Sequence, residues 1–573
     1  MSKLTRREFV RNSLMGISTA AITVGLSTSL TGCSSYDLIN ADFLHGVASG
    51  DPQSDRVIIW TRATPKDPAV DSVAILWEVA SDANFDQIIA RDVVSTSASR
   101  DFTIKVDVTG LSAATIYYYR FRSRNHRSPV GTTKTLPTGS IDQVKLIVVS
   151  CSNYPAGYFH AYGLAAQQSN IDAAIHLGDY IYEYGRDGYA SEDAEALNRQ
   201  VEPAHELITL ADYRARYAQY RTDSNLQAFH QAFPMIAVWD DHEVANDTWR
   251  DGAQNHDDSE GDFYVRLAAA LQAYAEWMPI RPPVDTNISS LYRSFEFGEL
   301  INLIMLDTRI IGRDKQLSYA DYFSNTGEFD YQQFNADRYS DRSLLGSNQL
   351  TWLKQQLDTN HQWHVLGQQV LMGEMNLPGA IVTGQLSLAE FFELAKLAEI
   401  AQTNPEALTN EQMQLLQEKG PLLQMPQLPY NLDAWDGYPK ERDEIFNHTK
   451  NNNSNLIALA GDTHNAWANE LNTIIEGDIV VRNGFEFATP SISSPGAESF
   501  LGLSTPEAVL QAETALRQLV WSLKYTNLSN RGFLTVTINR QAATANWTFI
   551  DTVKASSYQE LIIRRHEMAV IHQ

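Results

Sequence analysis

The sequence predicts an α/β domain preceded by a β-sandwich. From residue 144 onward, short apolar runs alternate with segments of helical period, as strands and helices do in an α/β fold. Residues 43–136 contain instead several runs rich in β-branched and aromatic residues, separated by turn residues. The stretch 136–140 contains Pro and Gly and is interpreted as a linker. We therefore expect a sandwich at 43–136 and an α/β domain at 144–553.

Composition limits the classes of function. The chain has 573 residues, 43% of them hydrophobic and 10% aromatic, which is typical of a globular protein with a large core. The net charge is -25, and no basic tract lies outside the N-terminus, so no nucleic-acid-binding surface is evident. Any phosphate chemistry must therefore depend on cations held locally at the site.

Residues 1–33 are predicted to be a twin-arginine and lipoprotein signal region. Residues 5–11 match a twin-arginine export signal, and 12–30 form a moderately apolar stretch too polar for a membrane span. Leu30-Thr31-Gly32-Cys33 resembles a lipobox, in which Cys33 is acylated. These features predict export by the twin-arginine machinery and a lipid anchor on the membrane, with the protein periplasmic or at the cell surface. The only other cysteine is Cys151, and a disulfide between the two is the alternative.

The first domain is predicted to contain at least four strands. The segments 57–62, 73–79, 103–108 and 115–121 carry the β-branched and aromatic residues, and several alternate apolar with polar positions. Gly110-Leu111 precedes the tyrosine-rich segment, an arrangement similar to that of a fibronectin-like sandwich.

The second domain is predicted to alternate strands and helices in chain order. Apolar strand-like runs occur at 146–149, 173–177, 236–239, 363–372 and 457–460, and closing strands at 531–549. Helical periodicity occurs at 158–169, 210–218, 263–277, from 345 onward, and at 386–418 with a break at Asn404-Pro405. We interpret 386–418 as a cap or insertion over the active-site edge. Residues 554–573 are predicted to be a C-terminal tail, with a surface helix as the alternative for 560–573.

Four of the predicted strands end in residues that bind metals. Asp179 follows the run 173–177, and Cys151, Asp240-Asp241-His242-Glu243 and Asp462-Thr463-His464 follow three others. Open α/β sheets place their ligands at such strand ends. The carboxylate of Asp179 can bridge two cations, and Tyr182 can offer a phenolate to one of them. Asp179 alone could be a turn residue that caps a helix, but four such ends favour one shared site.

The residue types indicate two kinds of cation. Thiolate, phenolate, carboxylate and imidazole together suit a redox-capable transition metal, whereas a group of aspartates suits Ca(II). Asp240 and Asp241 are adjacent and repel unless a cation is near, although either could be the ligand. His242 could be a core residue, a metal neighbour or a general acid. Asp51, Arg62, His176, His230 and His364 are interpreted as structural.

These motifs, in this order, resemble the calcineurin-like metallophosphoesterase superfamily and more closely the PhoD-like family of alkaline phosphatases. Further matching segments are Ala48-Ser49-Gly50-Asp51-Pro52, Trp60-Thr61-Arg62, Leu306-Asp307-Thr308-Arg309 and Trp435-Asp436-Gly437-Tyr438-Pro439. The resemblance covers nearly the whole chain after the signal region. It implies a two-sheet αββα core preceded by the β-sandwich.

The resemblance also implies a set of ligands. Fe(III) would be held by Cys151, Asp179, Tyr182 and His464, and Asp179 would bridge to one or two Ca(II) ions. Candidate calcium ligands are Asp240, Asp241 and Asp462; Asn246 would lie at the second calcium or the phosphate, and Arg186 would clamp the phosphate. Where the wider superfamily commonly has histidines, this chain has Gln368-Gln369 and Asp462, which disfavours a zinc or manganese pair.

The implied activity is hydrolysis of phosphate monoesters, and of diesters, by in-line attack of a metal-bound oxide or hydroxide. Arg186 and Asn246 would stabilise the equatorial charge. No Ser or Thr is placed as a nucleophile, so no covalent phosphoenzyme is expected. The alternatives are a phospholipase D-like phosphodiesterase on the same metals, and a lipid-anchored binding protein with an inactive phosphatase core.

Overall fold

The computed structural model describes residues 38–281, 291–451, 455–475, 479–561 and 566–571. The predicted signal region, with Cys33, lies outside these residues. Within the described part of the chain, no helix has both the length and the apolar character needed to cross a membrane.

Two large sheets form the centre of the molecule. In spatial order, the nine-stranded sheet contains β24 (His566–Ile571), β23 (Ala542–Ile550), β22 (Arg531–Asn539), β10 (Gln143–Val149), β11 (Ala173–His176), β12 (Pro234–Ala237), β2 (Val47–Gly50), β3 (Arg56–Arg62) and β7 (Thr103–Thr109). The seven-stranded sheet contains β13 (Arg293–Phe297), β14 (Ile301–Met305), β15 (Trp363–Gly367), β18 (Leu456–Ala460), β20 (Ile479–Ala488), β19 (Ala466–Ile475) and β21 (Leu523–Asn527).

The two sheets pack face to face because their strands are apolar on both sides. Along β10, Leu146 and Val148 enter the core between the sheets, together with Leu303 of β14. The alternate residues Ile147 and Val149 pack with the helices on the outer face. These helices are α2 (His160–Ala166), α3 (Leu210–Tyr220), α4 (Ser224–Ala232) and α5 (Phe263–Trp277).

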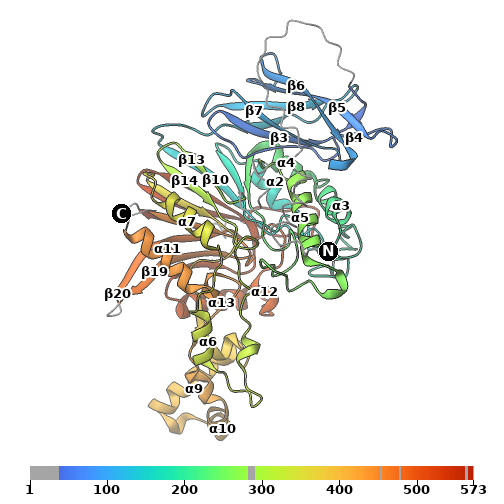
Figure 1. Cartoon of the computed structure of the whole chain (residues 1–573). Helices are drawn as coiled ribbons and strands as arrows, with labels where there is room; N and C mark the ends of the chain where they lie inside the picture. Colours follow the sequence, from blue (N-terminus) through green and yellow to red (C-terminus); the bar gives the residue numbers. More distant parts are fainter. Residues whose placement is uncertain (1–37, 282–290, 452–454, 476–478, 562–565, 572–573) are drawn as a thin grey trace, which may run out of the picture.

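The seven-stranded sheet is covered in the same way on its own outer face. Ile304 of β14 and Leu366 of β15 lie in one apolar cluster with residues of the helices α7 (Ser347–Leu357), α11 (Pro439–Asn451) and α13 (Pro506–Leu519). The four layers are therefore helix, sheet, sheet and helix (Figure 1). The αββα core expected from the resemblance is confirmed.

The N-terminal region forms a β-sandwich. Its outer sheet has the order β6 (Ile88–Ser97), β5 (Ser72–Ala80), β8 (Ile116–Arg122) and β9 (Gly131–Lys134), and it packs on β2, β3 and β7 through one apolar cluster. A small pair, β1 (Ala41–Asp42) and β4 (Thr64–Pro65), lies beside it. Because β2 also pairs in parallel with β12, the inner sheet of the sandwich continues into the sheet of the core.

A helical lobe projects from the end of the molecule opposite the sandwich (Figure 1). It includes α6 (Tyr331–Arg338), β16 (Asn376–Pro378), α8 (Gly379–Val382), α9 (Leu388–Thr403), α10 (Asn410–Lys419) and β17 (Gln427–Pro429). Ser387 and Thr409 begin α9 and α10 with capping boxes. The predicted break at Asn404-Pro405 separates these two helices.

Two predicted elements differ in the structure. The strand expected at 363–372 ends at Gly367, because the next two side chains bond to other loops. Gln368 Oε1 accepts from the Trp435 N–H at 2.9 Å, and Gln369 Nε2 donates to the Trp239 carbonyl at 2.6 Å. The C-terminal segment, expected as a surface helix or tail, contains the edge strand β24. Its antiparallel pairing with β23 supplies backbone hydrogen bonds that an isolated tail would lack.

Candidate metal centre

The site is built where parallel strands of both sheets end. Strands β10, β11 and β12 are parallel, as are β14, β15 and β18, so the carboxyl ends within each set share one edge. Gly178 lets the β11 loop approach the β12 loop: its φ is +101°, and a Cβ there would lie 2.4 Å from the Cβ of Asp240. Only glycine fits this contact without displacing the neighbouring loop.

Four predicted ligands have the backbone conformation that side chains rarely adopt. Cys151, Asp179, Asp462 and His464 have φ values of 60°, 54°, 61° and 63°. Non-glycine residues in this region are uncommon and cluster at functional sites. The sharp turn directs each side chain back toward the strand ends instead of along the sheet.

The first cluster joins a thiol, a carboxylate and an imidazole. One ligand atom each of Cys151, Asp179 and His464 lie within 4.8 Å of one another, and all three residues are buried. The Tyr182 hydroxyl donates to Asp179 Oδ2 at 2.9 Å and lies 3.3 Å from His464 Nε2. His464 Nδ1 donates to the Pro495 carbonyl at 2.7 Å, so Nε2 keeps its lone pair for the site.

The electrostatics of this cluster fit a bound cation. Burial, and then the charge of Asp179, raise the pKa of the Cys151 thiol well above its usual value, and burial does the same for the Tyr182 phenol. Burial lowers the pKa of His464 to about 3, which keeps its imidazole neutral. A neutral imidazole is ready to bind a metal, whereas the thiolate and the phenolate need a nearby cation to form.

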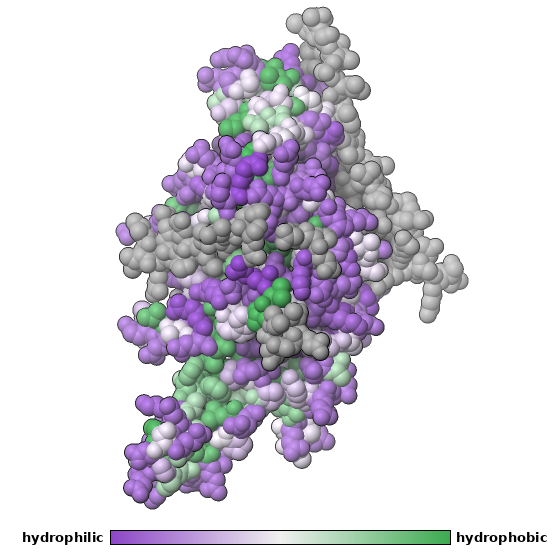
Figure 2. All heavy atoms as spheres, turned by 90° about the vertical axis from the view of Figure 1, so that its left-hand side faces the viewer, coloured by the Kyte–Doolittle hydropathy of each residue, from purple (hydrophilic) through white to green (hydrophobic). Residues whose placement is uncertain are grey.

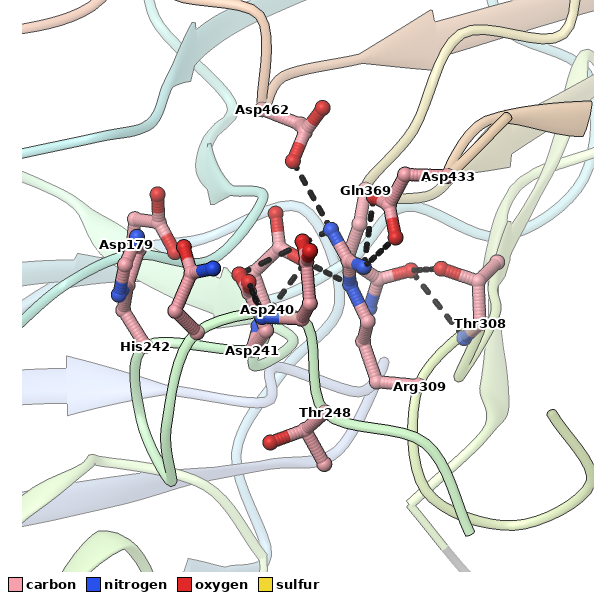
Figure 3. Close-up of polar contacts among 12 residues, drawn as sticks. Asp179, Asp240, Asp241, His242, Thr248, Thr308, Arg309, Gln369, Asp433 and Asp462 are labelled. Atoms are coloured by element: carbon pink, nitrogen blue, oxygen red, sulfur yellow. Dashed lines mark hydrogen bonds and ion pairs between the residues drawn. The ribbon is translucent and has the colours of Figure 1, made fainter. Parts of the chain in front are cut away.

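The second cluster consists of aspartates around one buried arginine. Ligand oxygens of Asp240, Asp241 and Asp462 lie within 4.8 Å of one another. Figure 3 shows the Arg309 guanidinium among the carboxylates of Asp240, Asp433 and Asp462. Its Nη2 lies 2.8 Å from Asp462 and its Nη1 lies 2.7 Å from Asp433, while Nε donates to Asp240. The Arg309 side chain is fully buried.

One arginine does not neutralise this group of acids. Burial raises the pKa of Asp462 to about 7 and that of Asp240 well above its usual value, despite Arg309. Asp179 Oδ1 and Asp240 Oδ2 are buried without a hydrogen-bond partner. Buried polar groups normally have partners, and a cation would supply one here. The donor set therefore fits metal ions in both clusters, and Asp179 belongs to the one that also holds Cys151.

His242 lies between the clusters and is held by Glu183. Its Nδ1 donates to Glu183 at 2.7 Å, and a ligand atom of His242 lies within 4.8 Å of Asp179 and Asp241. Burial would lower the pKa of His242, but the charges of Glu183, Asp241 and Asp179 outweigh it and raise the pKa well above its usual value. Glu183 also accepts from the backbone N–H of Asn246 at 2.8 Å, which places Asn246 beside this pair.

Glu243 joins the two loops that carry the aspartates. Its buried carboxylate accepts backbone N–H groups from Asp179 at 3.1 Å, Tyr180 at 2.5 Å and Asp240 at 2.6 Å. Burial raises its pKa to about 7 even with these donors. Glu243 is therefore a positioning residue for Asp179 and Asp240. In the sequence, Glu183 and Glu243 stand next to candidate ligands, but this position does not show which backbone groups they hold.

The predicted residues are brought together, with one exception. The guanidinium of Arg186 is paired with Glu202 and with the Val201 carbonyl at 3.1 Å, away from the aspartates. Arg309 lies among them instead. The segment Leu306-Asp307-Thr308-Arg309 matches the family and follows the buried strand β14, and these two signals in the sequence could have identified Arg309. Gln369, in place of a histidine, accepts from Thr308 Oγ1 at 2.7 Å and cross-links the loops.

Comparisons with known proteins agree with this geometry. The family model described as PhoD-like phosphatase matches residues 146–547, and the model of its N-terminal domain matches residues 29–137. The chain is 35% identical over 466 residues to alkaline phosphatase D of Bacillus subtilis (strain 168), covering 79% of this chain and 70% of that protein. A solved structure of PhoD aligns with a TM-score of 0.73 and 30% identity, covering 93% of this chain and 91% of the other. The chain therefore belongs to the PhoD-like phosphatase family, a family of phosphoric ester hydrolases.

Proposed function

We propose that this chain is an exported, metal-dependent alkaline phosphatase that hydrolyses phosphate monoesters. The observation that carries the proposal is the meeting of two ligand clusters where strands of both sheets end, with Asp179 in the cluster that holds Cys151 and also grouped with Asp241 of the other. The family membership and the 35% identical alkaline phosphatase support the same reaction class.

We assign the first cluster to Fe(III) and the second to Ca(II). Cys151, Asp179, Tyr182 and His464 combine soft and anionic donors, which suit iron, whereas Asp240, Asp241 and Asp462 offer only oxygens, which suit calcium. When bound, these cations neutralise phosphate charge and activate a water-derived nucleophile. Asp179 has one carboxylate oxygen without a hydrogen-bond partner and would contribute to both sites.

The remaining residues handle protons and orientation. Glu183 accepts from Nδ1 of His242, which leaves Nε2 of His242 to donate a proton to the leaving alcohol. Asn246 Nδ2 donates one N–H to Gln254 Oε1 at 3.0 Å, which fixes the side chain and leaves the second N–H to orient a phosphate oxygen. Arg309 keeps Asp240 and Asp462 in place through its ion pairs. Arg186 would have to leave Glu202 to reach a phosphate.

The reaction is tested by phosphate release from p-nitrophenyl phosphate, with metal analysis of the purified protein. We expect iron and calcium in the protein, and loss of turnover after chelation that is restored by adding the metals. A thiolate and a phenolate on Fe(III) give visible charge-transfer bands, so the protein should be coloured and Cys151→Ala should lose or shift the band. A colourless protein that contains zinc would disprove the iron assignment.

Export is a separate part of the proposal and has its own test. The twin-arginine motif and Cys33 support transport of the folded protein and a lipid anchor. We expect Cys33→Ala to release the enzyme from the membrane fraction with unchanged turnover. If the variant still sediments with membranes, Cys33 is not the anchor.

A further inference from the structure

An apolar cavity lies beside the metal centre, between the helical lobe and the C-terminal helices. It has a volume of about 220 Å³, and its eleven lining residues are all aliphatic or aromatic. One wall comes from α8 and the start of α9, with Ile381 and Leu388. The other comes from α12 (Ala497–Phe500) and α13, with Phe500 and Leu501. The mechanism proposed above uses none of these side chains.

The floor of the cavity is joined to the metal-binding loop. Trp467, a lining residue, donates from its indole N–H to Thr463 Oγ1 at 2.8 Å, and Thr463 lies between Asp462 and His464. The backbone N–H of Ala497, also in the lining, donates to Asn465 at 3.0 Å. The cavity therefore borders the loop that carries two of the ligands.

Tyr430 packs against Trp467 in the lining of the cavity. Its ring centroid is 6.5 Å from that of Trp467, and it lines the same cavity. Partial burial and the nearby Asp462 carboxylate raise the pKa of its phenol to about 12. Tyr430 thus packs beside Trp467, whose indole N–H contacts the metal-binding loop.

The cavity is open at its rim. Phe500 is 69% exposed, Leu501 47% and Tyr430 38%. Large apolar side chains that remain exposed around a hollow are typical of ligand sites. The lobe that provides one wall also carries apolar side chains on its surface, which Figure 2 shows in green over the lower part of the molecule.

We propose that this cavity binds the alkyl or aryl group of the phosphate ester, so that the enzyme prefers esters of small apolar alcohols and phenols. An apolar cavity of about 150 Å³ is enough to hold benzene, and this one is larger. A polyol or a sugar would find few hydrogen-bond partners there, because only Tyr430 and Trp467 of the eleven lining residues carry an O–H or N–H group, and the Trp467 N–H already donates to Thr463. The inference rests on the proposed phosphatase function, because it assigns a subsite to that reaction.

The first experiment measures kcat/KM for methyl, ethyl, butyl and hexyl phosphate, phenyl phosphate and glycerol phosphate. Complete burial of one methylene favours the longer ester by about fourfold, so we expect kcat/KM to rise by up to this factor per carbon. Ile381→Trp fills the cavity and should remove the dependence of kcat/KM on chain length. The matched control is Val265→Trp on α5, where residue 265 is 55% exposed and far from the lining.

The proposal would be overturned if kcat/KM rose with chain length equally in the wild type and in Ile381→Trp. It would also be overturned if kcat/KM were the same for all the esters. A second measurement separates this outcome from failure of the phosphatase function. Calorimetry with methylphosphonate and hexylphosphonate, which have no alcohol leaving group, reports binding alone. We expect tighter binding of the hexyl compound in wild type and not in Ile381→Trp. If no ester is hydrolysed, the phosphatase function fails, but the calorimetry still decides for or against the cavity.

Discussion

The side chains at the strand ends contain more negative charge than the protein alone can balance. Asp179 Oδ1 and Asp240 Oδ2 are buried without partners, and Arg309 serves several carboxylates at once. The sequence predicted the candidate ligands that the structure brings together, because each follows an apolar run. It could not predict which residues hold them, since Arg309 and Glu243 act through contacts that are distant in sequence. Arg186 shows the converse. It was predicted to clamp the phosphate, but in the structure its side chain is paired with Glu202.

Asp179→Asn is expected to give a folded protein without activity. The amide keeps the size of the side chain but loses the charge that a bridge between two cations requires. Loss of such a ligand should lower kcat by more than the ~10–100-fold that outer-shell changes cause, and should lower the metal content. Asp436→Asn is the control, because Asp436 is also buried but accepts from Met375 N at 2.8 Å and pairs with Arg442. Normal metal content and turnover in Asp179→Asn would disprove the bridge.

Arg309→Met is expected to destabilise the protein and to loosen the metal centre. Removing one partner of a buried ion pair leaves uncompensated charge and costs about 3–5 kcal/mol. Arg442→Met is the matched control, since Arg442 is buried and paired with Asp436 at 2.6 Å. Both variants should lower the free energy of unfolding in denaturant titrations, but only Arg309→Met should lower calcium content and turnover. Equal metal content in the two variants would show that Arg309 has only a structural role.

At the scale of elements, the site depends on how loops from separate strands are held together. The apolar runs predicted β10, β11, β12 and β18, because buried parallel strands are continuously hydrophobic. They did not predict where β15 ends, since Gln368 and Gln369 form hydrogen bonds with Trp435 and Trp239 of other segments. The β11 and β12 loops are joined by Glu243, and this junction is invisible in either segment alone.

Glu243→Gln is expected to lower both stability and activity. The carboxylate accepts three backbone N–H groups, whereas glutamine has one acceptor oxygen and would turn an N–H donor toward another donor. We expect a loss of about 1–3 kcal/mol of unfolding free energy and a 10–100-fold fall in kcat, by analogy with outer-shell changes at metal sites.

Glu441→Gln provides the matched control for this variant. Its buried carboxylate accepts from the backbone of Leu344 at 2.6 Å and Leu345 at 3.1 Å, and from Ser343 Oγ at 2.7 Å. It should lose similar stability and keep its turnover. Similar kcat losses in both variants would mean that the effect at Glu243 is one of general stability.

At the scale of the whole molecule, the sandwich and the core form one continuous structure. The sequence predicted the two patterns of strands and the linker between them, because these are local signals. It could not predict the pairing of β2 with β12, which joins residues almost two hundred positions apart. Asp51, expected to have a structural role, follows β2 and is fully buried at this junction. Its carboxylate pairs with Arg293 of β13 at 2.7 Å and accepts from the Arg281 N–H at 2.6 Å.

Asp51→Ala is therefore expected to destabilise the whole protein. The substitution leaves Arg293 largely buried without its partner, at a cost of about 3–5 kcal/mol. The control is Asp101→Ala, which breaks the Arg62–Asp101 pair inside the sandwich, where both side chains are 17% exposed and the loss should be about 1 kcal/mol or less. Because Asp51 links the sandwich to both sheets, calorimetry should show one transition at a lower temperature. An early, separate transition of the sandwich, with the core transition unchanged, would show that the two parts unfold independently despite the shared sheet.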